Sequence, residues 1–378
     1  MPTPGGTTRL GAATAWVRLN GPARVGGVDL ARGLAVLGMF AAHLLWITDP
    51  FAWADPSTWT AVVQGRSSIL FATLAGVSIG LVTGGGMPLA GAAMRTARRR
   101  LAVRAGLLWL LGVLLILTGV PVYVILPAYA ILFLCAVPLT ALSARALLVL
   151  AAVLAVVMPF VQVVLDALPV WATPEGADLS LVLGWHYPFT TWIAFIVAGL
   201  GVARAGIARP RVQWWMLAAG AALATAAYAT AAASGASPEA EDSFGGALWT
   251  ARAHSSGLLE VIGSGGFALA VIGACLLLCR TAARWVVLPL RAVGAMPLTA
   301  YTLQLGVWAI IAAVVLGDSG DLAGFRALEP FWPLALGTIA FATAWALLIG
   351  RGPLEWVVDR VVRLVVRPGV AASRRDQG

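Results

Sequence analysis

The feature that most constrains this chain is a series of long apolar runs separated by short polar segments. Each run holds about 20 residues, the length that an α-helix needs to cross the hydrocarbon core of a bilayer. Charged residues make up 11% of the chain, whereas an ordinary soluble domain carries roughly 25%. The strands of a membrane barrel would alternate apolar and polar residues, and the runs lack that alternation. We therefore predict an all-α, polytopic helical membrane protein.

The apolar runs predict about ten transmembrane helices. Their expected positions are Val28–Ile47, Val62–Thr83, Leu101–Thr118, Val122–Leu142, Ala146–Leu165, Tyr187–Ala205, Gln213–Ala233, Gly257–Cys279, Val293–Leu316 and Phe331–Ile349.

The arginines orient these helices. All 25 basic residues are arginine, and most fall on alternate connecting segments, while acidic residues collect on the others. Because arginine-rich segments stay in the cytoplasm, we predict that both termini are cytoplasmic. The chain then divides into a cytoplasmic tail (residues 1–27), a transmembrane domain (28–350), and a cytoplasmic interfacial helix with a tail (351–378).

Three ionisable residues share one face of the first predicted span. At about 100° per residue, Arg32 and His43 differ by only some 20° around the helix, and Asp29 lies within roughly 40° of His43. Charged groups inside a span are costly and are functional candidates. Asp29 and Arg32 could instead neutralise each other as an i,i+3 pair, and His43 could form a structural hydrogen bond. We assign Asp29 and Arg32 to a cytoplasmic binding site and His43 to chemistry near the outer face.

The predicted topology brings other candidate residues to the outer face. His186 and His254 precede spans, Arg66 lies at the mouth of the second span, Glu260 lies one turn into its span, and Asp49 lies in an outer loop. Imidazole exchanges protons near neutral pH, and a carboxylate can orient it. Glu260 could instead complement its helix dipole, and the two loop histidines could be ordinary loop residues. The histidines lack the short spacing of a zinc site, so no metal is expected.

The cytoplasmic side offers a glycine-rich turn that leads into the arginines Arg98, Arg99 and Arg100. The turn lacks the GK[ST] ending of a P-loop, and membrane orientation by positive charge also explains the arginines. In the ninth span, Gln304 belongs to a polar patch that could line a cavity or form interhelical hydrogen bonds. We assign these four residues to the same cytoplasmic site as Arg32.

Several motifs resemble one family of transmembrane acyltransferases. RVGGVDLARGLAVLGMFAAH, GRSSILFATLAGVSIGL and HSSGLLEVIGSGG are similar to the family of heparan-alpha-glucosaminide N-acetyltransferase, and the first opening also resembles the YeiB (DUF418) family. RAVGAMPLTAYTLQ and RGPLEWVVDR look like the C-terminal motifs of the DUF418 group. These motifs reach from one end of the chain to the other.

The resemblance implies transfer of an acyl group, in this family acetyl, from cytoplasmic acyl-CoA to a hydroxyl or amine acceptor at the outer face. Acyl-CoA (acetyl-CoA) is then the co-substrate, and Arg32 with Arg98–Arg100 would hold its phosphates. His43 would act as the base or carry the acyl group, assisted by Glu260, His254 or Asp49. Arg66 and His186 would bind the acceptor.

The runner-up is a transporter that uses His43 and Glu260 as a proton relay, although the paired broken helices of many transporters are not evident. The expected location is the plasma membrane. The expected partners are the lipid bilayer and a small-molecule or glycan acceptor, and a homodimer is left open. Nucleic acid is not expected, because the arginines lie between apolar runs instead of forming a solvated basic face.

Overall fold

The computed structural model describes residues 14–17, 19–21, 24–52, 54–234 and 243–367. Within these ranges the chain is helical and contains no strand, which confirms the predicted fold class. The outermost parts of the two predicted cytoplasmic tails, residues 1–13 and 368–378, lie outside the described part.

In the described part of the chain, eight helices are long and apolar enough to cross a membrane. Seven of them are α2 (Gly26–Leu44), α6 (Ala144–Asp166), α8 (Phe189–Gly206), α9 (Pro210–Ala233), α11 (Leu258–Leu278), α14 (Pro297–Val315) and α16 (Phe331–Leu348). The eighth is α3 (Arg66–Val82), which the 3₁₀ helix η1 (Pro56–Val63) precedes. All eight coincide with predicted spans, so the protein is a multi-pass membrane protein.

The other two predicted spans correspond to α4 (Gly91–Ile116) and α5 (Leu126–Ala136). The first begins a full ten residues before the predicted Leu101, and its first half carries the arginine cluster. The second has only 11 helical residues and continues into the 3₁₀ helix η2 (Pro138–Ala141). Neither meets the length and composition of a complete span.

The predicted span Val293–Leu316 is wrong at its start. The structure divides this region into α13 (Leu288–Ala295) and α14, with the break at Met296. Pro297 has no backbone N–H and therefore begins α14 in its first turn. The apolar character of the sequence continues through the break, so hydropathy alone did not reveal it.

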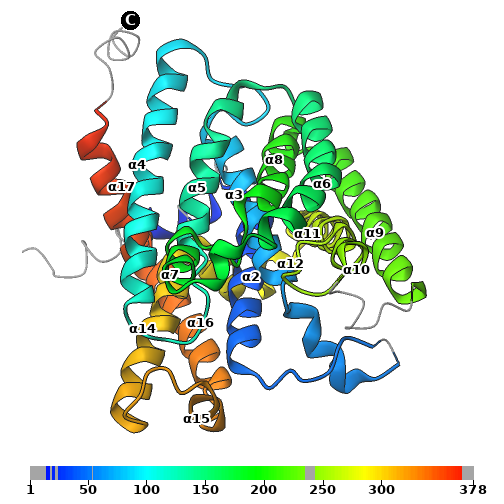
Figure 1. The fold of residues 1–378 in the computed structure, drawn as a ribbon. Helices are drawn as coiled ribbons and strands as arrows, with labels where there is room; N and C mark the ends of the chain where they lie inside the picture. The colour runs from blue at the N-terminus through cyan, green and yellow to red at the C-terminus, as the bar shows by residue number, and fades with distance from the viewer. Residues whose placement is uncertain (1–13, 18, 22–23, 53, 235–242, 368–378) are drawn as a thin grey trace, which may run out of the picture.

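The short helices and 3₁₀ turns lie between the spans and beyond the last one. They are η3 (Pro169–Ala172), α7 (Pro174–Leu183), α10 (Phe244–Leu248), α12 (Ala283–Val286), α15 (Leu322–Ala327) and α17 (Pro353–Val365). In Figure 1, α17 lies beside α4 at the left edge, and α15 lies at the lower end.

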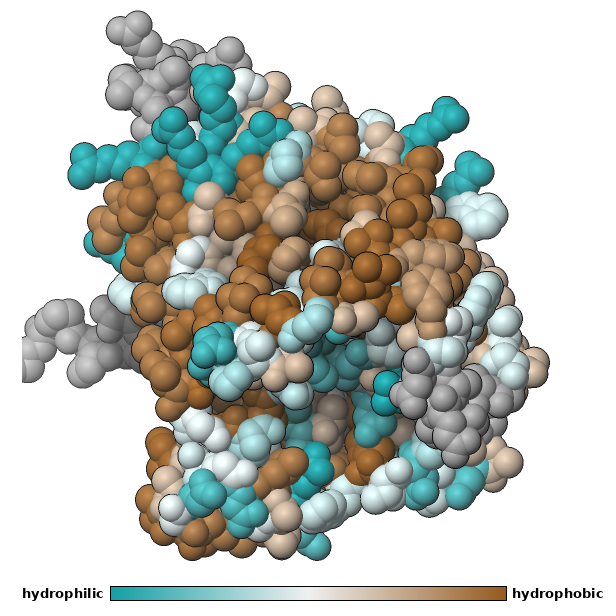
Figure 2. All heavy atoms as spheres, viewed as in Figure 1, coloured by the Kyte–Doolittle hydropathy of each residue, from teal (hydrophilic) through white to brown (hydrophobic). Residues whose placement is uncertain are grey.

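The centre of the bundle is formed by α2, α3 and α8, which are the most buried spans, while α6, α9 and α16 expose most of their surface. Glycine lets the central helices approach closely: a Cβ on Gly199 of α8 would collide with the backbone of Thr73 on α3. Small residues at helix contacts are how membrane helices gain van der Waals packing. Figure 2 shows hydrophobic side chains covering the middle of one face, with hydrophilic side chains towards both ends.

Candidate active site

His43 lies in the last turn of α2, where a long-range hydrogen bond orients its ring. Its Nδ1 is 3.3 Å from Nε2 of Gln304, a fully buried residue on α14. The structure thus places the Gln304 amide against His43, whereas the prediction assigned this residue to the same site as Arg32. The backbone carbonyl of His43 accepts a hydrogen bond of 3.0 Å from Nε of Arg326 on α15.

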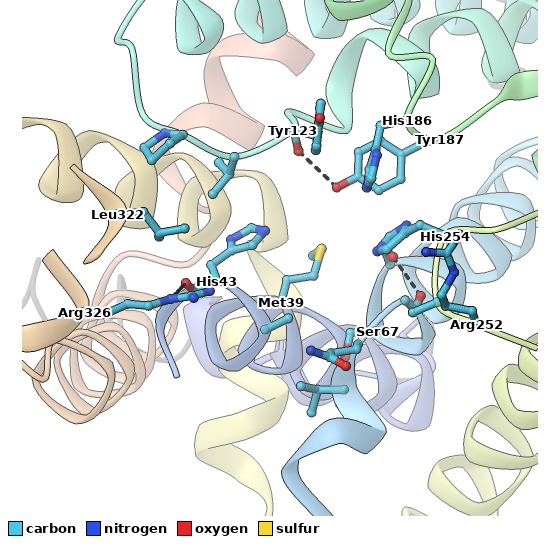
Figure 3. A pocket seen from close by; sticks show the side chains of 18 residues that line it. Met39, His43, Ser67, Tyr123, His186, Tyr187, Arg252, His254, Leu322 and Arg326 are labelled. Carbon is cyan, nitrogen blue, oxygen red and sulfur yellow. Dashed lines mark hydrogen bonds between the residues drawn. The ribbon is translucent and has the colours of Figure 1, made fainter. Parts of the chain in front are cut away.

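All three histidines of the chain line one cavity of about 410 Å³. We call it the outer cavity, because the predicted topology turns it away from the cytoplasm. It lies between the end of α2, the start of α3, the segments before α5 and α8, the loop before α11, and α15. Figure 3 shows the labelled side chains of His43, His186, His254, Arg252 and Arg326 around a common space. The predicted gathering of histidines is therefore present in the structure.

Glu260 holds the loop that carries His254. Its Oε1 accepts from the backbone N–H of His254 at 2.5 Å, and its Oε2 accepts from the N–H of Ser256 at 2.6 Å and from Ser255 Oγ at 3.1 Å. His254 and Ser256 both have positive φ, 63° and 56°, a conformation that costs free energy and needs such support. The carboxylate thus binds the backbone of the loop that carries His254, whereas the prediction gave Glu260 the role of assisting His43.

His186 and His254 form an aromatic wall on the side of the cavity opposite His43. Their ring centroids are 4.5 Å apart, and the ring of Tyr123 stacks on His186 at 3.9 Å. Burial lowers the pKa of His186 to about 4. Burial, with the nearby imidazoles, lowers the pKa of His254 to about 3. Both rings are therefore neutral at pH 7 and can accept hydrogen bonds from a bound molecule.

Two outer residues predicted for the site lie elsewhere. Arg66 donates from Nε to the hydroxyl of Tyr228 at 2.8 Å, and its guanidinium lies over that ring. Asp49 is exposed and accepts from its neighbour Thr48. Neither belongs to the cavity lining, so the structure does not bring these two predicted site residues together with the histidines.

Sequence analysis missed two arginines of the cavity lining, Arg252 and Arg326. A signal for them was available, because they are the two arginines in outer loops that are otherwise acidic. Arginine on the outer side departs from the charge rule that orients the chain, and such a departure indicates a function.

The charged residues at the start of α2 lie in a second region. We call its cavities the cytoplasmic cavities, because the arginine distribution predicts that this side faces the cytoplasm. The carboxylate of Asp29 accepts from Arg24 at 2.5 Å and from Arg32 at 3.2 Å. Arg32 also donates to Ser78 Oγ at 2.6 Å. Arg32 thus forms the i,i+3 pair with Asp29. It also lines a cavity of about 330 Å³ between α3, α4, α5 and α14.

A neighbouring cavity of about 600 Å³ shares Arg104 and Glu355 with the first. Arg24 and Arg351 also line it. The predicted cluster Arg98–Arg100 lines neither cavity. Arg98 instead donates to Thr140 and to the carbonyl of Pro138, and Arg99 is exposed. The arginine of α4 that joins Arg32 is thus Arg104, one turn beyond the cluster.

The family model described as "Heparan-alpha-glucosaminide N-acetyltransferase, catalytic" matches residues 24–235, more than half of the chain. The chain belongs to this family. The model of a protein of unknown function, DUF418, matches residues 201–364. These matches confirm the resemblance seen in the motifs. No curated protein and no solved structure matches the chain.

In this heparan-alpha-glucosaminide N-acetyltransferase family member, both matched regions build the site. Asp29, Arg32 and His43 lie in the region of the catalytic family model. Gln304 and Arg326 lie in the region of the DUF418 model. The chain therefore needs both regions to complete the surroundings of His43.

The outer and cytoplasmic cavities approach each other at two tyrosines. Tyr129 lines the cytoplasmic cavity, and its hydroxyl donates at 3.3 Å to the carbonyl of Ser68, which lines the outer cavity. Tyr301 also lines the cytoplasmic cavity, and Gln304 follows it on α14 by three residues, about 4.5 Å along the axis. Tyr129 and Tyr301 thus link the lining of the cytoplasmic cavity to residues that lie at the outer cavity or contact His43.

In the described part of the chain, no group of three His, Cys, Asp or Glu side chains is arranged to hold a metal ion. The three histidines of the outer cavity instead lie around its wall, each on a different element.

Proposed function

We propose that the protein is a membrane acyltransferase that moves an acetyl group from cytoplasmic acyl-CoA to a hydroxyl or amine acceptor in the outer cavity. The observation that carries this proposal is the position of α14. Tyr301 of this helix borders the arginine-lined cytoplasmic cavity, while Gln304, one turn away, contacts His43 in the outer cavity. A donor on one side and an acceptor on the other can therefore meet near one imidazole.

The cytoplasmic cavities fit the chemistry of the donor. A coenzyme A molecule has a phosphate-bearing nucleotide and a long, narrow arm. Arg24, Arg104 and Arg351 line the larger cavity, and guanidinium groups bind phosphates by paired hydrogen bonds. The smaller cavity continues from Arg32 past apolar side chains to Tyr129 and Tyr301. We assign the phosphates to the arginines and the arm to this narrower cavity.

The thioester supplies an activated acyl group. In this proposal His43 Nε2 removes the proton from the acceptor hydroxyl or amine as the new C–O or C–N bond forms. The C–S bond breaks, and the imidazolium returns the proton to the leaving sulfur, which gives free coenzyme A. Because Nε2 is then the base, Nδ1 carries the ring proton, and we assign Gln304 the amide orientation in which its otherwise unpaired Oε1 accepts from Nδ1–H.

A second version of this mechanism makes His43 a transient acyl carrier. It predicts that labelled coenzyme A exchanges into acetyl-CoA without an acceptor, whereas direct transfer predicts no exchange. The transporter alternative receives no support from the matched family models. We expect the protein in the plasma membrane.

The proposal is tested with purified protein in lipid nanodiscs and radiolabelled acetyl-CoA. We predict that Arg104→Gln weakens acetyl-CoA binding about tenfold, through the loss of one charge-assisted contact. His43→Ala should retain binding and lose slow acetyl-CoA hydrolysis by about 100-fold or more, the usual contribution of a general base.

The matched control is Arg99→Gln, because Arg99 is exposed and lines neither cytoplasmic cavity. It should leave both binding and hydrolysis unchanged. Absence of acetyl-CoA binding to the wild type, or full hydrolysis by His43→Ala, would refute the proposed function.

A further inference from the structure

Arg326 is held rigidly beside His43. Its Nε donates to the backbone carbonyl of His43 at 3.0 Å, and its guanidinium carbon lies 5.4 Å from the ring centroid of Trp46. The carbonyl is one of the last four of α2, which have no partner within the helix. The two contacts fix the plane of the guanidinium, so that little side-chain entropy is lost when it binds a ligand.

The rest of this guanidinium is available to a ligand. Across the residues that the structure describes, neither terminal amino group of Arg326 donates to a protein acceptor, and no carboxylate pairs with it. Arg326 lines the outer cavity together with His43. Arg326 thus lines the cavity with its Nε engaged and, within the described residues, with its two terminal amino groups left for a ligand.

The charge of the cavity lining favours an anion. Arg252 and Arg326 both line it, the three histidines include two that burial keeps neutral, and no Asp or Glu is among the lining residues that the structure describes. Nearby carboxylates are engaged locally. Asp321 accepts from the N–H of Gly324, and Asp55 accepts from Ser57.

We propose that the acceptor carries an anionic group, a carboxylate, phosphate or sulfate, which Arg326 binds while His43 acts on a neighbouring hydroxyl or amine. This inference rests on the proposed function and adds the charge class of its acceptor. A planar guanidinium binds such oxyanions through two parallel hydrogen bonds. Arg326 then determines specificity and sets the distance between the anion and the reacting group.

The test measures ligand binding without acetyl-CoA, in nanodiscs of phosphatidylcholine, by tryptophan fluorescence. The probes are glucose, glucuronate and glucose 6-phosphate, which share a ring and differ in charge. The wild type should bind at least one of the two anions about tenfold or more tightly than glucose, the effect of a charge-assisted pair. Equal binding of all three probes would overturn the inference.

Variants assign the preference to one residue. Arg326→Gln should abolish the preference for the anions, and Arg326→Lys should retain part of it, because the charge remains without the planar fork. Arg66→Gln is the matched control, since Arg66 lies on the predicted outer side of the membrane but contacts Tyr228 and does not line the cavity. A preference that survives Arg326→Gln would assign it to another group and overturn the inference.

Nanodiscs that contain phosphatidylglycerol distinguish two sources of the anion. If the lipid weakens binding of the soluble anions to the wild type but not to Arg326→Gln, the anionic group belongs to a lipid headgroup. If it has no effect, the anion belongs to a soluble acceptor, and either result supports the proposed site.

Acetyl-CoA binding, measured in the same preparations, separates this inference from the proposed function. Retained acetyl-CoA binding without any anion preference would refute the anionic acceptor alone. An anion preference in a protein that does not bind acetyl-CoA would refute the acyltransferase and leave Arg326 as an anion-binding residue. Retained acetyl-CoA binding by Arg326→Gln also shows that this variant is folded.

Discussion

At the scale of single residues, the pair formed by His43 and Gln304 joins positions 261 residues apart in the sequence. Helical periodicity correctly placed Asp29, Arg32 and His43 on one face of one helix. It could not predict the partner of His43, because a contact between two helices depends on how they pack. The same limit explains why Arg98–Arg100 line neither cytoplasmic cavity. Their charge was evident from the sequence, but the side to which these arginines face depends on how α4 packs against its neighbours.

Gln304 gives a prediction about orientation. Replacement by leucine removes the contact with Nδ1 but keeps an apolar fit in the bundle. We expect kcat to fall about 100-fold, as for a misplaced catalytic group, while KM for acetyl-CoA stays unchanged. Gln304→Glu should restore much of kcat, because a carboxylate can also hold Nδ1–H. A rise in KM with unchanged kcat would instead indicate that Gln304 binds the donor.

The loop histidines give a prediction about pH. Because the folded-state pKa values of His186 and His254 are about 4 and about 3, the unfolded chain binds protons first as the pH falls below about 6.5. Their contribution to stability is therefore complete above pH 6.5 and is lost towards pH 4. At pH 5 the loss amounts to at most about 2 kcal/mol for each histidine.

Thermal unfolding of nanodisc-embedded protein between pH 7 and pH 5 checks this sign. The melting temperature of His254→Asn should fall less with acidification than that of the wild type. Asparagine tolerates the positive φ at this position and does not titrate. Parallel curves for the two proteins would show that His254 is not the responsible group.

At the scale of helices, the C-terminal helix α17 is fastened to the start of α14. Oε1 of Glu355 accepts from the N–H of Leu298 at 2.7 Å and of Thr299 at 3.2 Å, and Oε2 accepts from Thr299 Oγ1 at 2.5 Å. A carboxylate at a helix N-terminus satisfies unpaired N–H groups and the helix dipole. The amphipathic pattern of α17 predicted an interfacial helix, but this attachment could not be read from it.

Glu355→Ala should therefore release α17 from α14, at a cost of about 2 kcal/mol. Trypsin cleavage after the exposed Arg360 measures the release, and we expect it to be about 30-fold faster in the variant, in proportion to the opened population. Asp359→Asn is the control, because Asp359 pairs with the more exposed Arg351 and Arg363. Equal cleavage of wild type and Glu355→Ala would contradict the attachment.

For the helices taken together, the sequence predicted where the spans lie along the chain better than it predicted where a helix is interrupted. Long apolar runs predict spans because a helix needs about 20 residues to cross the bilayer, and eight of the predicted spans are such helices. The break at Met296 and the short α5 were missed, because an apolar run hides a proline at a helix start.

At the scale of the whole molecule, the proposed function requires that an acetyl group passes from a donor on one side of the bilayer to an acceptor on the other side. The arginine distribution predicts that the donor cavities face the cytoplasm and that the histidine cavity faces outward. Family membership supports an acetyltransferase, and the tyrosines between the two cavities indicate where the transfer would occur. The direction of transfer remains a prediction.

The most direct measurement uses sealed vesicles that contain the protein in one orientation. Labelled acetyl-CoA is added outside, where the cytoplasmic face is exposed, and membrane-impermeant sugars with hydroxyl, amine and phosphate groups are trapped inside. We predict acetylated product in the trapped compartment, and none with His43→Ala. Product that forms only on the acetyl-CoA side, or equally with His43→Ala, would contradict transfer through the site at His43.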